Sequence, residues 1–246
     1  MTKFSKSCIG NHIRSIRSSF INKARTLCDS ELREIKHIIK SGENDSHNLD
    51  ELTMESDAVF IRRLETFPQA LKMSFWENHF EWKSLECYPQ ICGRMLDFGC
   101  GSGHLDIMLA RNGMTVKGID LSPIGISIAN NLKSKEVIQV QERLSFEVAD
   151  VTKVSPREEL FDSAWSAHVF EHITDPGPVL KGMKNWLKPG AYLLISVPLG
   201  FAHDDPGHVN HFENGEQLSS FLEEYITVER IDISSEYNVI RALCRV

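Results

Sequence analysis

The chain changes in character near residue 94, where short hydrophobic runs begin to alternate with polar segments long enough to form helices. This alternation is typical of βαβ units that build a parallel sheet. It predicts five strands, at residues 95–98, 115–119, 144–148, 163–166 and 192–197. Helices are expected between them at residues 103–112, 123–132 and 178–187, and the Pro-Gly pair within residues 187–190 is the stop signal of the last one.

Two further apolar segments, at residues 225–234 and 238–246, follow these strands. Only Ser235, Glu236 and Tyr237 separate them, and so short a connection joins antiparallel strands. The pattern therefore predicts an α/β fold, with a doubly wound, mostly parallel sheet that ends in an antiparallel hairpin.

The first third of the chain has a different pattern. Residues 30–40 and 49–71 show hydrophobic residues at helical spacing, residues 41–46 form a turn by composition, and the aromatic residues Trp76, Phe80 and Trp82 follow. A length of 246 residues suits one large domain with a helical appendage. We expect residues 1–85 to form a helical cap over the ligand side of the sheet, and residues 86–246 to form the α/β domain.

Composition narrows the classes of partner. Lys and Arg number 27 against 34 Asp and Glu, giving a formal charge of −7, which disfavours duplex nucleic acid as a partner. We expect no membrane span, because the chain has no run of about 18 apolar residues. The six cysteines contain no CxxC pair and indicate reduced thiols of a cytoplasmic protein. The basic opening segment, residues 1–25, fits a polar terminus, an amphipathic surface helix or a targeting stretch.

The most informative segment is LDFGCGSG at residues 96–103, where a predicted strand enters a glycine-rich turn before a helix. Such a turn lets a ligand approach backbone N–H groups. Asp97 at the end of the strand would repel a pyrophosphate and attract an ammonium group. Asp120 follows Gly99 by 21 residues and is positioned to accept hydrogen bonds from ribose hydroxyls. These features predict a ligand with a ribose, an amino group and no diphosphate.

At this point the chain resembles the class I S-adenosylmethionine-dependent methyltransferases, over about residues 90–200. LDFGCGSG at residues 96–103, GIDLSP at 118–123 and ADVTKV at 149–154 look like the first three motifs of that family. The segments at 161–176 and 187–198 look like its fourth strand and the stretch that follows. The resemblance implies a Rossmann-like fold, S-adenosylmethionine as the cofactor, S-adenosylhomocysteine as the product, and methyl transfer as the activity.

The resemblance also implies roles for individual residues. Asp97 would hold the amino group of the cofactor, and Asp120 would bind its ribose hydroxyls. At the glycine-rich turn, the implied cofactor contacts are Gly99, Cys100, Gly101 and Gly103. The implied contacts of the adenine are Leu121, Asp150 and the backbone of Val151. Those of the methionine arm are Ala167 and His168. The residue types leave alternatives open, in which Asp120 caps a helix, Asp150 forms a turn and Leu121 belongs to the core.

Methyl transfer to a hydroxyl or amine requires removal of a proton, and histidine titrates near neutral pH. His172, after the fourth strand, is the first candidate for a general base, and a structural role is the alternative. His208 and His211 lie in the polar loop after the fifth strand and are the other catalytic candidates; His203 lies in that loop too. A divalent metal held by Glu171, His172, His208 and His211 is the less favoured alternative.

The motifs and the histidine-rich loop together predict O-methylation of a small-molecule or glycan-type polar acceptor. A protein or RNA methyltransferase and a non-catalytic module that binds S-adenosylmethionine are the alternatives. The residues do not predict an oligomeric state.

Overall fold

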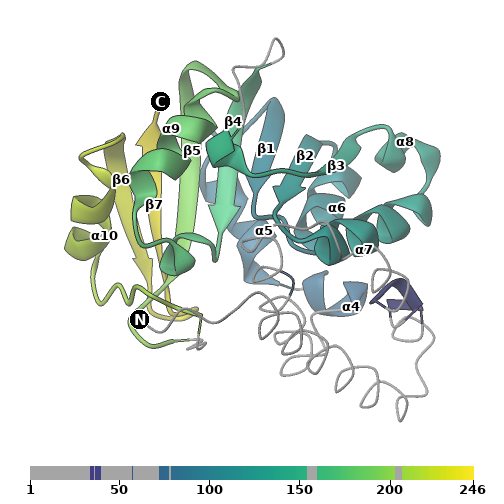
Figure 1. Ribbon diagram of the computed structural model, residues 1–246, viewed down its shortest axis with the longest axis horizontal. Coiled ribbons are helices and arrows are strands. Elements are labelled where there is room, and N and C mark those ends of the chain that lie inside the picture. The colour runs from purple at the N-terminus through teal and green to yellow at the C-terminus, as the bar shows by residue number, and fades with distance from the viewer. Residues whose placement is uncertain are drawn as a thin grey trace, which may run out of the picture.

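The structure is a computed structural model, and it describes residues 34–35, 37–39, 57, 72–77, 79–153, 160–202 and 207–246. Its centre is a sheet of seven strands in the order β3-β2-β1-β4-β5-β7-β6 (Figure 1). The strands are β1 Arg94–Phe98, β2 Thr115–Asp120, β3 Leu144–Val148, β4 Phe161–Ala167, β5 Leu187–Pro198, β6 Thr227–Ser234 and β7 Val239–Arg245. The first five are parallel, and β7 is antiparallel to both β5 and β6.

Helices cover both faces of this sheet. They are α6 His104–Arg111, α7 Pro123–Ser134, α8 Ile138–Gln141, α9 Pro176–Lys184 and α10 Gly215–Leu222. Because side chains alternate along a strand, the neighbours Met95 and Leu96 of β1 enter different hydrophobic clusters. Met95 packs with α6, α7 and α8, whereas Leu96 packs with α9 and α10. The predicted doubly wound α/β fold with a terminal antiparallel hairpin is confirmed.

Two local predictions differ from the structure. Residues 187–190 begin β5 rather than ending a helix, because Leu187 is buried and pairs with Phe161, while the helix already ends at Lys184. Helix α10 was not predicted, although Leu218 and Leu222 at helical spacing and the cap of Asn214, whose side chain accepts from the Gln217 N–H, indicate it.

The N-terminal part is described at fewer positions. Residues 34–35 and 37–39 are helical, as predicted, and Ile35 and Ile39 share the hydrophobic cluster of Met95. Helices α4 Met73–Trp76 and α5 Phe80–Ser84, with the 3-10 turn η3 Leu85–Cys87, lead into β1. Both helices pack against α6. The opening basic segment and most of residues 41–71 lie outside the described residues, and the division at residue 85 stays a prediction.

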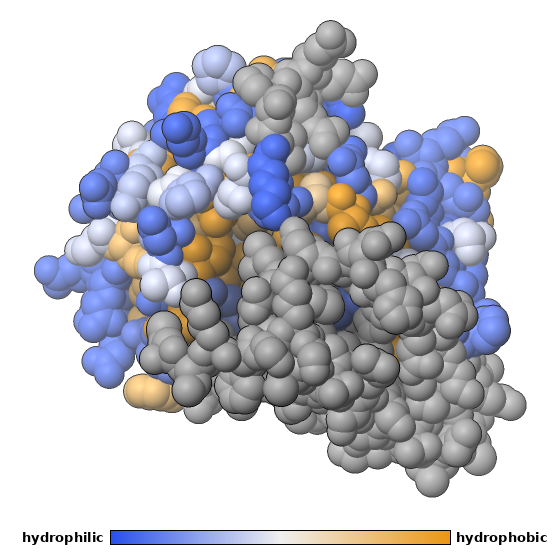
Figure 2. Space-filling view, viewed as in Figure 1, coloured by the Kyte–Doolittle hydropathy of each residue, from blue (hydrophilic) through white to orange (hydrophobic). Residues whose placement is uncertain are grey.

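Figure 2 shows hydrophilic residues toward the margins of this view and hydrophobic residues toward its middle. Among the described residues, no helix is long and apolar enough to cross a bilayer. The described cysteines, Cys87, Cys92, Cys100 and Cys244, carry free thiols.

Candidate functional site

The glycine-rich turn lies between the end of β1 and the start of α6. Gly99 and Gly103 adopt φ values of +82° and +69°, in the left-handed region that favours glycine. A Cβ atom on Gly99 would lie 2.2 Å from Cγ2 of Val169, and one on Gly103 would lie 2.7 Å from Cβ of Ala129. Only glycine fits this turn, whose backbone therefore stays open to a ligand.

Asp120 ends the neighbouring strand β2 and ties it to this turn. Its Oδ2 accepts a hydrogen bond from the Gly101 N–H at 2.9 Å, and its Oδ1 accepts one from the Ser122 N–H at 2.8 Å. These two bonds fix the position of both carboxylate oxygens, each of which can accept more than one hydrogen bond. Leu121, next in the chain, is half-buried beside it. The arrangement suits a ribose at the end of β2.

A second carboxyl group lies buried near Asp97. Asp97 is 4% exposed and Asp106, on the first turn of α6, is completely buried. Burial, together with Asp106 and Asp120, raises the pKa of Asp97 well above its usual value. Burial likewise raises the pKa of Asp106 to about 7, and it raises the pKa of the adjacent Cys100 thiol. These neighbouring carboxyl groups therefore resist ionising together, and a bound ammonium group would stabilise their charged forms.

Asp150 and Val151 follow β3 at the same end of the sheet. The Oδ1 atom of Asp150 accepts hydrogen bonds from the Thr152 N–H at 2.9 Å and the Thr152 hydroxyl at 2.6 Å. Asp150 thus forms a turn, while Val151 is buried, with its carbonyl against Gly182 of α9. A turn-forming role does not conflict with an adenine contact, and the latter stays a prediction.

Ala167 and His168 lie at the end of β4. His168 has a φ of +58°, which is uncommon for a residue other than glycine and is frequent at functional sites. Its Nε2 lies 3.3 Å from Oε1 of Glu81, and its Nδ1 lies 3.6 Å from Oε1 of Glu171. Burial alone would lower the pKa of His168, but the carboxylates of Glu171 and Glu81 outweigh it and raise this pKa to about 9. His168 therefore carries a positive charge at neutral pH.

Glu81, on α5, is a residue that the sequence analysis missed. It is completely buried, and its carboxylate accepts hydrogen bonds from the Ser196 hydroxyl at 3.3 Å and from Nη2 of Arg241 at 3.5 Å. In Figure 1, α5 lies at the end of the sheet to which the arrow of β4 points. Glu81 belongs to no motif, so only the fold reveals it.

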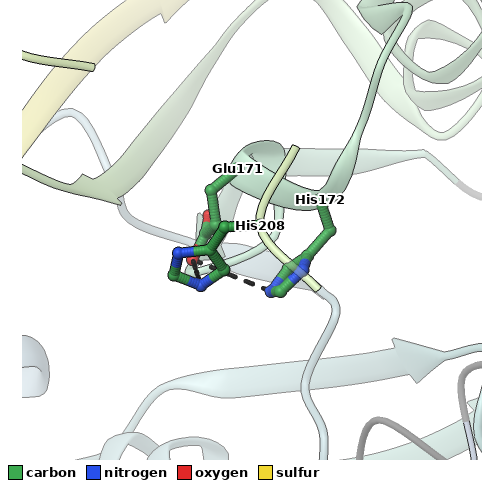
Figure 3. Close-up of side chains that lie close together, drawn as sticks. All are labelled: Glu171, His172 and His208. Carbon is green, nitrogen blue, oxygen red and sulfur yellow. Dashed lines mark ion pairs between the residues drawn. The ribbon is translucent and has the colours of Figure 1, made fainter. Parts of the chain in front are cut away.

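A second cluster combines the 3-10 turn η5, Phe170–His172, with the loop after β5. The side chains of Glu171, His172 and His208 point toward one another (Figure 3). Oε1 of Glu171 lies 4.0 Å from Nε2 of His172 and 3.9 Å from Nε2 of His208. Nδ1 of His172 forms a hydrogen bond of 2.9 Å with the Gly207 carbonyl. The arrangement can remove a proton or hold a cation.

The remaining predicted histidines are placed differently. The ring of His211 is 6.1 Å from that of His208, and it stacks on Phe201 at 4.2 Å. His211 therefore lies beside the cluster and outside its contacts with Glu171. His203 lies outside the described residues.

Comparison with known proteins identifies the family. Residues 60–228, more than half of the chain, match the family model described as a methyltransferase domain. The chain belongs to this methyltransferase family. The sequence resemblance to methyltransferases is thereby confirmed, and the matched region includes the residues of the site described above except Arg241.

A curated relative is also named as a methyltransferase. The methyltransferase domain is 32% identical over 123 residues to the ubiquinone biosynthesis O-methyltransferase of Paraburkholderia phymatum, covering 49% of this chain and 51% of that protein. The chain thus spans about half the length of this curated relative.

Two solved structures share the fold. The glycopeptide N-methyltransferase MtfA complexed with S-adenosyl-L-methionine has a TM-score of 0.56 at 13% identity, over 67% of this chain and 92% of that one. The [4+2]-cyclase SpnF also has a TM-score of 0.56, at 16% identity, over 67% and 78%. At such identities they support the Rossmann-like fold alone.

Proposed function

We propose that this protein transfers a methyl group from S-adenosylmethionine to an oxygen atom of a small polar acceptor. The observation that carries the proposal is the Asp120 carboxylate, which ends β2 beside the glycine-rich turn and accepts hydrogen bonds from the Gly101 and Ser122 N–H groups. The family membership and a relative named as an O-methyltransferase support it.

On the cofactor side, the ammonium group of S-adenosylmethionine is assigned to Asp97, and the ribose to Asp120. Leu121, Asp150 and Val151 are assigned to the adenine. The acidic pocket of Asp97 and Asp106 favours this ligand, because a dinucleotide would bring two phosphates against buried carboxyl groups. When bound, the cofactor supplies an activated methyl group on a sulfonium.

On the acceptor side, His172 and His208 are assigned to the acceptor hydroxyl. The ring of His211 lies beside that of His208. The hydroxyl loses its proton, and its oxygen forms a bond with the methyl carbon. The bond from carbon to sulfur breaks, and its electron pair stays on the sulfur of S-adenosylhomocysteine. The protein aligns the two reactants and assists removal of the proton.

The acceptor is proposed to be a small molecule, of the phenol or glycan type. The curated relative is named for ubiquinone biosynthesis, which favours a small organic acceptor over a protein or RNA. The formal charge of −7 is also unfavourable for an RNA substrate.

The N-terminal segment is proposed to close the acceptor side. Glu81 contacts His168, and the ring of Trp76 stacks at 5.8 Å on His104, next to the glycine-rich turn. Deletion of residues 1–48 should leave cofactor binding intact. Deletion through residue 82 should abolish turnover, and unchanged turnover would contradict this role.

The first experiment is calorimetric titration of the protein with S-adenosylmethionine and S-adenosylhomocysteine. We expect micromolar binding, and at least a 100-fold loss of affinity in Asp120→Ala, because the variant loses both the ribose contact and the bond to Gly101. Asp232→Ala, at a half-buried carboxylate on β6, is the matched control. Equal affinity of Asp120→Ala and the natural protein would contradict the proposal.

A second measurement separates methyl transfer from binding alone. Formation of S-adenosylhomocysteine in the presence of candidate phenols and glycans tests turnover. Binding of the cofactor without product from any acceptor class would favour a module that binds the cofactor without catalysis. The cyclase SpnF illustrates that this fold also serves a protein named for another reaction.

A further inference from the structure

The carboxylate of Glu171 is buried without a hydrogen bond. Its residue is 1% exposed, and neither oxygen has a hydrogen-bond partner among the described residues. The nearest nitrogen atoms are Nδ1 of His168 at 3.6 Å and those of His208 and His172 at 3.9 and 4.0 Å. The positive ring of His168, which Glu81 also contacts, is the nearest charge, and a buried carboxylate whose oxygens accept no direct hydrogen bond is suited to bind a further positively charged group.

Three potential ligand atoms converge at this position. Oε1 of Glu171 and one ring nitrogen each of His172 and His208 lie within 4.8 Å of one another (Figure 3). Around a tetrahedral ion with bonds of about 2.1 Å, neighbouring ligand atoms are about 3.4 Å apart. The separations from Glu171, 3.9 and 4.0 Å, exceed this value by about half an ångström, and the two histidine nitrogens lie within 4.8 Å of each other, so rotamer adjustments would close the site on an ion.

The surroundings orient these atoms. The Gly207 carbonyl can only accept a hydrogen bond, so Nδ1 of His172 carries the proton and Nε2 carries the lone pair of the neutral ring. A backbone carbonyl that fixes the tautomer in this way is typical of metal-binding histidines.

The same loop is fastened to the turn that carries Glu171. The backbone carbonyl of Glu171 accepts hydrogen bonds from the N–H groups of Val209 at 2.8 Å and Asn210 at 3.0 Å. The side chain of Asn210 donates to the Ile173 carbonyl at 2.7 Å. The histidine from the loop after β5 is thus held against the turn after β4 before any ligand binds.

We propose that Glu171, His172 and His208 bind one divalent transition-metal ion. Two imidazole nitrogens favour zinc, manganese or cobalt over magnesium and calcium, which prefer oxygen ligands alone. His211 is excluded from the ligand set, because it stacks on Phe201 beside the cluster.

A metal ion at this position would define the acceptor more closely, and this inference rests on the proposed function. Three protein ligands leave coordination positions open, as in catalytic metal sites. Two adjacent oxygen atoms of an acceptor, such as those of a vicinal diol, can occupy them. A bound ion would lower the pKa of a coordinated hydroxyl, whose proton would then pass to solvent water rather than to His172. The substrate class is therefore an acceptor that chelates a metal through neighbouring oxygens.

The test is metal binding by the full chain without cofactor or acceptor. The protein is treated with a chelator, desalted and titrated calorimetrically with zinc, manganese or magnesium chloride. We expect one equivalent of zinc or manganese to bind, at least 100-fold loss of affinity in Glu171→Gln and His208→Ala, and a higher melting temperature of the natural protein with metal. Cobalt should give visible absorption bands that His208→Ala lacks. Glu213→Gln, at an exposed carboxylate in the same loop region, should bind metal unchanged.

Failure of this inference and failure of the proposed function give different results. Circular dichroism and S-adenosylmethionine titration establish that each variant is folded. If the folded protein binds the cofactor but no metal, or if Glu171→Gln and His208→Ala both bind metal unchanged, the metal site is wrong and the proposed function stands. Metal binding without cofactor binding would overturn the proposed function instead.

Discussion

The cofactor side and the acceptor side of the site are built in different ways. The proposed cofactor side consists mainly of one stretch of chain, from Asp97 through the glycine-rich turn to Leu121, joined by Asp150 and Val151 after β3, and it depends largely on backbone conformation. The proposed acceptor side combines Glu81 from α5, Glu171 from the turn after β4 and Arg241 from β7. The first side therefore depends mainly on local structure and neighbouring strands, whereas the second exists only when the whole sheet has assembled.

Of the changes that test this difference, Glu81→Ala is expected to cause the largest loss of stability. This change leaves Arg241, which is 6% exposed, without its buried partner, so we expect a loss of about 3–5 kcal/mol in the free energy of unfolding. Urea denaturation measures it. Glu77→Ala, which removes a surface ion pair with Arg111, is the matched control, with an expected loss of less than about 1 kcal/mol.

Equal losses in these two variants would contradict the importance of the buried pair. If Glu81→Ala remains folded, cofactor affinity should change little, because Glu81 lies on the acceptor side. A parallel loss of cofactor affinity would show that the two sides are not independent.

Asp106→Asn tests the acidic pocket on the cofactor side through its pH dependence. A carboxyl group whose pKa is about 7 in the folded protein and about 3.8 in the unfolded chain stabilises the fold fully below about pH 4. This contribution is lost as the pH rises through 7. The asparagine variant lacks this titration, so at pH 8 we expect it to be more stable than the natural protein by about 1–3 kcal/mol. Urea denaturation at pH 5, 7 and 8 measures the difference.

Asp162→Asn provides a control of opposite sign. The Asp162 carboxylate accepts a hydrogen bond from the Arg94 N–H, and Lys188 and Arg94 lower its pKa. Its contribution is present at neutral pH and is lost as the pH falls through this lowered pKa. The variant should therefore be less stable than the natural protein at pH 8, and a stabilised variant would contradict the assignment.

Asn210→Ala is expected to cause the smallest loss of stability, and its effect on turnover should come from the proposed acceptor side alone. The change removes the bond to the Ile173 carbonyl and costs about 1 kcal/mol. Asn214→Ala, which removes the N-cap of α10, should cost about the same. Only Asn210→Ala should lower turnover, because it releases the loop that carries His208. Equal turnover in both variants would indicate that this loop needs no such bond.

Much of the fold was predictable because its signals are local. The strand-turn-helix pattern around Gly99 and the short connection at residues 235–237 each depend on neighbouring residues. The insertion of β7 between β5 and β6 was not predictable in the same way, because it is a choice among long-range pairings.

The residues of the candidate site also differ in whether local sequence indicates them. Asp97 and Asp120 belong to motifs, so the sequence indicated their positions, whereas Glu81 reaches the acceptor side only through tertiary packing. The sequence also suggested Glu171, His172 and His208 as a secondary alternative for a metal. Sequence spacing could not separate His208 from His211, which differ in the ring that each one contacts.

The order of the sheet also bears on how the protein is made. The pair between Glu81 and Arg241 joins residues 160 positions apart, and the strand that carries Arg241 is the last of the seven to be synthesised. On the ribosome, β1 to β4 can assemble around the glycine-rich turn while β7 is still absent. The nascent chain should therefore form the proposed cofactor pocket before β7 brings Arg241 against Glu81.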